Sequence, residues 1–103
     1  MAEKKLGILL FNGPESQDVY TAIGLVDAAL NRGIGVEMFM MYNAVQNAVV
    51  PELESLADRG ATITVCTHNA DERKAARSEK FRYGGQYDNA NIVGDTDRYL
   101  AFI

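Results

Sequence analysis

A junction of one kind, leading from a helix into a strand, occurs twice in this chain and restricts the folds open to it. Each junction ends in arginine and glycine and precedes an apolar strand: Leu30-Asn31-Arg32-Gly33 and Ala57-Asp58-Arg59-Gly60. The glycine supplies a left-handed helix cap, and the arginine complements the helix dipole. Two such junctions in succession predict right-handed β-α-β crossovers, and therefore an α/β fold with a mostly parallel sheet.

The spacing of apolar residues predicts the elements between these junctions. An unbroken apolar run at residues 6–11 predicts a first, central strand that is covered on both faces. Apolar residues between 19 and 30 recur at intervals of four, three and four, which predicts a helix beginning near Ser16. The other elements predicted in this part are strands at 34–41 and 61–66 and a helix at 51–59.

The last third of the chain is less regular. Residues 69–80 are highly charged, which predicts a solvated helix or a partly mobile segment. A short strand is expected at 81–83, and the Asp- and Asn-rich residues 86–95 can form only a weak helix. The apolar residues at 98–103 predict a buried terminal strand. About five strands are therefore expected in total.

Length and charge limit the possible functions. The chain has 103 residues, which suits one domain spanning 1–103. A net charge of −4 lacks the basic character that nucleic-acid binding needs. The first apolar run is too short for a signal peptide or a membrane span, so the cytoplasm is the expected location. A single cysteine excludes an intrachain disulfide and a multi-cysteine metal site; neither a metal nor a cofactor is expected.

The one cysteine, Cys66, is the best candidate for function because it follows the strand at 61–66 directly. In open α/β sheets, the carboxyl ends of the strands lie at one edge, where ligands bind. The loops after three strands would meet there, which predicts a pocket formed by Cys66 with Asn12, Gly13 and Tyr42.

The residues after Cys66 could support a thiolate. Thr67, His68 and Asn69 follow at once, and Arg73 comes seven residues later, so hydrogen-bond donors and positive charge are near. Each has a simpler explanation as well. A free cysteine often only packs, a histidine in a polar loop often faces solvent, and Arg73 could pair with the nearby acids.

Several enzyme classes disagree with the sequence. A cysteine phosphatase needs five residues between its cysteine and arginine, whereas Cys66 and Arg73 have six between them, including two acids that would repel phosphate. The turn after the first strand lacks both the glycine pattern of dinucleotide-binding folds and a Ser/Thr-rich phosphate loop. The four residues at 38–41, which are rich in methionine, are explained by core packing rather than by a soft-metal site.

The order of these features resembles the DsrE/DsrF-like family of sulfur-relay proteins, which includes the TusD type. The residues that carry the resemblance are Lys5–Pro14, Val19–Ala22, Ala28–Gly33 with Val36–Phe39, Leu56–Cys66, and Asp97–Phe102.

This resemblance implies a flavodoxin-like three-layer α/β/α subunit, which in the family usually assembles into homo- or hetero-oligomers such as trimers and hexamers. It also implies that the cysteine ending the third strand, Cys66 here, carries a persulfide received from a donor protein and passed to an acceptor. The chain departs from the family in residues 67–95, where Arg73 is followed by Lys74 rather than glycine. The alternative is a non-catalytic oligomeric module or small-ligand binder in which Cys66 is inert.

Overall fold

The strands of the computed structural model, which describes residues 4–103, form one sheet in which all neighbouring strands are parallel. Their order across the sheet is β4-β3-β2-β1-β5. The strands are β1 (Lys5–Leu10), β2 (Gly35–Met40), β3 (Thr62–Cys66), β4 (Arg82–Gly84) and β5 (Arg98–Phe102). The α/β fold with a sheet of five strands is therefore confirmed.

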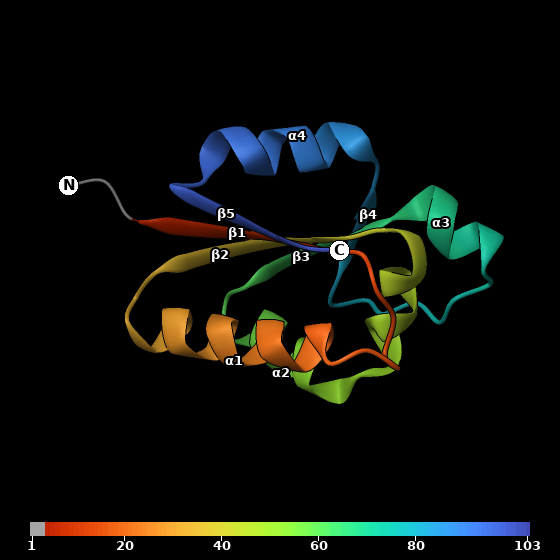
Figure 1. The fold of residues 1–103 in the computed structure, drawn as a ribbon, viewed down its shortest axis with the longest axis horizontal. Coiled ribbons are helices and arrows are strands. Elements are labelled where there is room, and N and C mark those ends of the chain that lie inside the picture. Colours follow the sequence, from red (N-terminus) through yellow and green to blue (C-terminus); the bar gives the residue numbers. More distant parts are fainter. Residues whose placement is uncertain (1–3) are drawn as a thin grey trace.

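Helices cover both faces of this sheet, as Figure 1 shows. Helices α1 (Asp18–Asn31) and α2 (Pro51–Asp58) pack side by side on one face, and α4 (Gln86–Asp95) lies on the other. The 3-10 helix η1 (Tyr42–Val49) and α3 (Thr67–Glu72) pack against each other beyond the carboxyl ends of the strands. The result is the expected flavodoxin-like arrangement of three layers, α/β/α. None of these helices, within residues 4–103, combines the length and the hydropathy needed to cross a membrane.

Both helix-to-strand junctions have the predicted backbone. Gly33 and Gly60 adopt positive φ angles of 75° and 112°, in the range that glycine tolerates best. Arg59 has a further role, because its guanidinium donates to Asp27 Oδ1 at 2.6 Å and to Asn31 Oδ1 at 2.9 Å. The second junction therefore also fastens α2 to α1.

The core lies on both faces of the interior strands, and many of its side chains come from β1 and β2. Ile8, Leu10, Met38, Phe39 and Met40 are all fully buried. Strands covered on both faces have continuous apolar runs rather than alternating ones, which is the pattern of residues 6–11 and 38–41. The methionine-rich segment is therefore core, as expected. The middle strand of the sheet is β2, and β1 lies between β2 and β5.

The prediction of a buried terminal strand at 98–103 is wrong. Strand β5 is an edge strand with β1 as its one neighbour, and Leu100 and Ile103 are 40% and 81% exposed. The physical reason is coverage: α1 packs on β1 and β2. Apolar composition alone does not distinguish an interior strand from an edge strand.

Smaller differences concern helix boundaries. Helix α1 begins at Asp18, and the Ser16 hydroxyl accepts a hydrogen bond from the Asp18 N–H at 3.1 Å. The 3-10 helix η1 was not expected. In the charged segment 69–80, the helix ends at Glu72, while α4 forms a complete helix of ten residues where only a weak one was predicted.

Candidate functional site

Cys66 lies where the sequence placed it, at the carboxyl end of β3 and directly before α3. Its side of the sheet follows from the register. A side chain at Gly7 would meet Ile92 of α4 at 3.1 Å, so the side of β1 to which Gly7 belongs faces α4. Gly7 pairs with Glu37, and Glu37 pairs with Thr62, so these three residues lie on the same face of the sheet. Cys66 comes four residues after Thr62 on β3. Because side chains alternate along a strand, Cys66 faces α4 as well. It is 7% exposed.

The neighbour of Cys66 across the sheet is Gly84 of β4, and the carboxylate of Asp88 occupies the space above this glycine. Asp88 Oδ2 accepts a hydrogen bond from the Gly85 N–H at 2.9 Å and so caps the start of α4. Since glycine has no side chain, this is half of a capping box. An acidic group therefore lies one strand away from the cysteine, on the same face of the sheet. The glycine pair followed by an acid at the third helical position was the sequence signal for this cap, and the sequence analysis missed it.

Tyr42 organises the loop after β2. It has a positive φ of 55°, which is uncommon for any residue other than glycine. Its N–H donates to Asn69 Oδ1 at 2.7 Å, its ring stacks on Phe11 with centroids 4.6 Å apart, and the Arg73 guanidinium lies 4.5 Å from the ring centroid. Residues from the loops after β1, β2 and β3 therefore meet at Tyr42, as predicted for this edge of the sheet.

Glu72 is the second centre of the same network, and the sequence analysis did not identify it. Asn69 Nδ2 donates to Glu72 Oε1 at 3.1 Å, and an Arg73 nitrogen donates to the same oxygen at 2.9 Å. The hydrogen bond from Asn69, followed by that from Arg73, lowers the pKa of Glu72 below its ordinary value. Arg73 Nε also donates to Asn43 Oδ1 at 2.9 Å. We call Tyr42, Asn43, Asn69, Glu72 and Arg73 the carboxyl-end network.

The other two predicted supporting residues lie at the start of α3. Thr67 is the first helical residue and is half-buried, whereas His68 is exposed. The Nε2 atom of His68 is 3.5 Å from Glu72 Oε2. His68 and Arg73 thus face Glu72, which agrees with the simpler explanations considered for both: a solvent-facing histidine and an ion-paired arginine.

Asn12 and Gly13 connect the loop after β1 to η1. The Asn12 side chain donates to Asp18 Oδ2 at 2.8 Å, and the backbone carbonyl oxygen of Asn12 accepts from Asn47 Nδ2 at 3.1 Å. Gly13 is buried, and a side chain there would lie 3.1 Å from the Asn43 carbonyl oxygen. Asn47 is fully buried, and its Oδ1 has no hydrogen-bond partner among residues 4–103. These contacts fix the floor of the loop cluster, although they do not place Asn12 or Gly13 against the thiol.

A surface depression of about 350 Å³ adjoins the carboxyl-end network. Its lining includes Pro14, Gln46, Arg73 and Lys74. Cys66 is not part of its lining, so this depression does not expose the thiol. Within residues 4–103, no three His, Cys, Asp or Glu side chains are grouped so that they could hold a metal ion.

The fold and the position of the cysteine define a three-layer α/β protein with a single thiol at the carboxyl edge of its sheet. Among solved structures, the ychN protein from E. coli is similar, with a TM-score of 0.84 and 16% identity, over 98% of this chain and 100% of that one. A conserved protein of unknown function from Bacteroides thetaiotaomicron has a TM-score of 0.74 and 13% identity, over 96% and 95% of the two chains. At these identities the likeness is one of fold. Neither a protein-family model nor a curated protein sequence matches the chain.

Proposed function

We propose that this chain is a sulfur carrier of the DsrE-like kind, in which Cys66 accepts and passes on a persulfide sulfur. The observation that carries the proposal is the place of Cys66, the last residue of a parallel strand at the edge where α/β folds position their chemistry. The similar fold of the ychN protein over the whole of both chains supports it, together with the order of residues shared with the DsrE/DsrF-like family.

The chemistry needs one thiol. The Cys66 thiolate attacks the outer, sulfane sulfur of a donor persulfide, a sulfur–sulfur bond forms at Cys66, and the donor leaves as a thiolate. In the second step an acceptor thiolate attacks the outer sulfur on Cys66, and the Cys66 thiolate is released. Each step exchanges one sulfur–sulfur bond for another, so no external oxidant or reductant is required. A lone cysteine is therefore sufficient.

In this proposal the predicted supporting residues act mainly by shaping the rim around Cys66. Asn69 and Arg73 connect α3 to Tyr42 and Asn43 after β2. The Asn12 backbone connects the loop after β1 to Asn47 of η1. Thr67 is the residue next to the thiol along the chain. Sulfur transfer requires an acceptor to reach a side chain that is 7% exposed and that lies directly before α3.

The burial of Cys66 also favours the second candidate, a non-catalytic module or small-ligand binder in which the thiol is core. Cys66 packs with the apolar residues of the main core cluster. Free cysteine is among the most frequently buried residue types and often behaves as a small apolar side chain.

Mass spectrometry of the intact protein separates the two candidates. The folded chain is treated with a low-molecular-weight persulfide and, in parallel, with a thiol-alkylating reagent. The sulfur-carrier proposal expects one added sulfur atom that is lost on reduction and absent from Cys66→Ser. It also expects the persulfidated protein to transfer that sulfur to an added thiol.

The control is the same protein unfolded in denaturant, where Cys66 is fully accessible. The sulfur-carrier proposal would be overturned if the unfolded chain is alkylated while the folded chain shows neither alkylation nor a sulfur adduct. The non-catalytic module with an inert Cys66 would then be the better description. Thr67→Ser serves as a matched variant, because it changes the neighbouring hydroxyl residue while leaving the thiol in place.

We also propose that the chain assembles with itself, with trimers or hexamers expected from the family resemblance. The support is strand β5, an edge strand with the exposed apolar residue Leu100, and the exposed Ile103 that follows it. Exposed edge strands favour pairing with another chain unless they are covered. Sedimentation of the protein at micromolar concentration should give a mass above that of a monomer, and Leu100→Lys should reduce it. A monomer at every concentration would contradict the proposal.

A further inference from the structure

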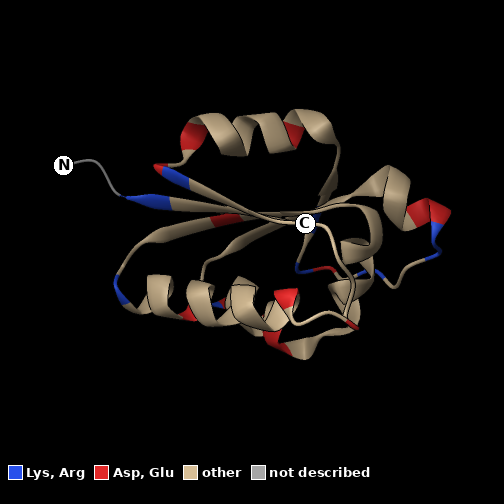
Figure 2. Ribbon diagram, in the orientation of Figure 1, with Lys and Arg blue, Asp and Glu red and all other residues tan. Residues whose placement is uncertain are grey.

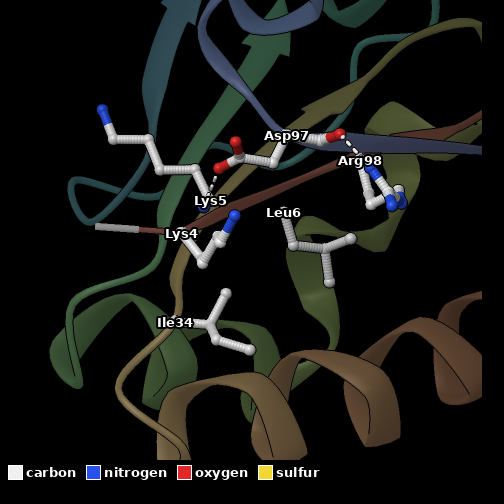
Figure 3. A pocket seen from close by; sticks show the side chains of 6 residues that line it. All are labelled: Lys4, Lys5, Leu6, Ile34, Asp97 and Arg98. Carbon is white, nitrogen blue, oxygen red and sulfur yellow. Dashed lines mark hydrogen bonds between the residues drawn. The ribbon is translucent and has the colours of Figure 1, made fainter. Parts of the chain in front are cut away.

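A second concave site lies at the opposite end of the sheet from Cys66. It is a pocket of about 300 Å³ at the amino ends of β1, β2 and β5, shown in Figure 3. Its lining consists of Lys4, Lys5, Leu6, Ile34, Asp97 and Arg98. A volume of this order lies at the lower end of the range typical of small-molecule sites.

The floor of this pocket is apolar. Leu6 and Ile34 are half-buried and pack against the edge of the core, and in Figure 3 both point toward α1. Leu6 pairs with Arg98 across the sheet, so these two side chains share the same face. The floor stays open because α1 packs on β1 and β2, while β5 is the exposed edge strand beside them.

The rim of this pocket is cationic, although the whole chain carries a net charge of −4. Figure 2 shows basic residues at the beginnings of both β1 and β5. The carboxylate of Asp97 accepts from the Lys5 N–H at 2.8 Å, and the Lys5 ammonium is 3.6 Å from Glu37. The two acids near the rim are therefore already in contact with Lys5.

The remaining two cations are Lys4 and Arg98. Arg98 donates one N–H to the Asp97 carbonyl oxygen at 3.0 Å, which leaves its other donors available. Within residues 4–103, neither Lys4 nor Arg98 forms an ion pair with a carboxylate. A guanidinium beside an apolar floor binds carboxylates through charge-assisted hydrogen bonds while the floor receives the carbon chain.

We propose that this pocket binds a small amphiphilic carboxylate, with the carboxylate at Arg98 and Lys4 and a short aliphatic chain on Leu6 and Ile34. Three of the six lining residues are cationic, and the one acid among them is engaged by a backbone N–H, which selects an anion over a cation. The apolar floor selects a ligand with a carbon chain over an inorganic ion. This site is independent of Cys66 and of the proposed sulfur transfer.

The test is a titration of the isotope-labelled protein with hexanoate, followed by two-dimensional NMR. Hexanol and hexylamine, which have the same chain length without the negative charge, are titrated in parallel. The expected result is a saturable shift confined to residues 4–6, 34–35 and 97–98 with hexanoate, and much weaker changes with the other two compounds. Added salt should weaken the binding of hexanoate.

Arg98→Gln should weaken the binding of hexanoate by about tenfold, the effect of losing one charge-assisted contact of modest strength. Arg32→Gln is the matched control, since it removes the same charge from an exposed position outside the lining, and it should leave binding nearly unchanged. Equal shifts with hexanoate and hexanol, equal effects of the two variants, or no saturable shift would each overturn the proposal. Shifts of residues 4–6 and 34–35, which lie outside β5, with protein concentration alone would also overturn it, because the occupant would then be a second copy of the chain.

Discussion

The two ends of the sheet differ in how their side chains are engaged. At the carboxyl end, Tyr42, Asn69 and Arg73 contact one another or share Glu72, and Cys66 is buried. At the amino end, Lys4 and Arg98 rim an open pocket of about 300 Å³. The carboxyl end has the longer connections after β1 and β2, which supply side chains for a network, whereas the helix-to-strand junctions at Gly33 and Gly60 on the amino side are short.

Backbone geometry gives the same contrast. The two non-glycine residues with positive φ among residues 4–103 are Tyr42 and Lys74, and both lie at the carboxyl end. Tyr42 precedes Asn43 in the chain, and Lys74 follows Arg73. Such conformations are costly and persist where the surroundings fix them. At the carboxyl end, tertiary contacts therefore determine the local backbone conformation. Such conformations are common at functional sites, which agrees with the location of the candidate site.

The largest expected effect on stability concerns the packing of α4 on the amino end of β1. On the side facing α4, a side chain at Gly7 would approach the Thr96 hydroxyl at 2.8 Å and Ile92 at 3.1 Å. Gly7→Ala should therefore lower the free energy of unfolding by about 2 kcal/mol through overpacking. Chemical denaturation measures this change.

Gly35→Ala is the matched control, because Gly35 is also a strand glycine at the amino end. The nearest atom to its added methyl group would be Lys5 Cγ at 3.4 Å, an ordinary contact. Its free energy of unfolding should stay within about 0.5 kcal/mol of the parent. Equal losses in the two variants would mean that α4 does not pack on Gly7 as described.

The next effect compares the two ends directly through one arginine from each. Arg73→Ala removes the contact with the Tyr42 ring and the hydrogen bonds to Asn43 and Glu72. A loss of about 1–2 kcal/mol in the free energy of unfolding is expected. Arg98→Ala removes a hydrogen bond to a backbone carbonyl at an exposed position and should change it by less than about 0.5 kcal/mol. If Arg98→Ala costs as much as Arg73→Ala, the open amino end is not a feature of the protein in solution.

Much of the fold could be predicted from the sequence because the junctions at Gly33 and Gly60 are local signals. A glycine after an amphipathic helix specifies the end of the helix without reference to the rest of the chain. The location of Cys66 at the carboxyl edge followed from the same signals. The exposure of β5 could not be predicted, because the order of strands in a sheet depends on which strands pair across the whole chain. The local sequence around Leu100 is as apolar as that of a strand in the core.

The carboxyl-end network was predicted only in part. Tyr42, Asn69 and Arg73 were expected near one another because their loops follow neighbouring strands. Asn43 was expected at this edge because it follows Tyr42 in the loop after the second predicted strand. Glu72 was considered as one of the acids that would repel phosphate or pair with Arg73, but no pattern pointed to its hydrogen bond with Asn69. The contacts of this network depend on η1, which begins at Tyr42 with a positive φ angle. Tertiary contacts hold this conformation, and because the residue is not a glycine, the sequence gives no sign of it.

A smaller effect of opposite sign tests the strain at the end of α3. Lys74 is exposed and has a φ of 49°, a conformation in which glycine is preferred. Lys74→Gly should raise the free energy of unfolding by about 0.5–1 kcal/mol, because the αL penalty is removed. Ala76→Gly, at an exposed position without positive φ, should lower it instead. A loss in both variants would indicate that Lys74 does not adopt this backbone in solution.

The smallest effect concerns pH and tests whether Glu72 joins the network. Hydrogen bonds from Asn69 and Arg73 lower its pKa from 4.5, so the folded state favours the ionised carboxylate. Its contribution to stability is present above pH 4.5, the ordinary value, and is lost as the pH falls through the lower folded pKa. In denaturation from about pH 6 to about pH 3, Glu72→Gln should therefore be less stable than the parent at the upper limit and approach it at the lower. Glu79→Gln, at an exposed position outside the network, should follow the parent at both. A difference between Glu72→Gln and the parent that persists unchanged in acid would show that Asn69 and Arg73 do not contact this carboxylate, and the carboxyl end would then be held by the Tyr42 contacts alone.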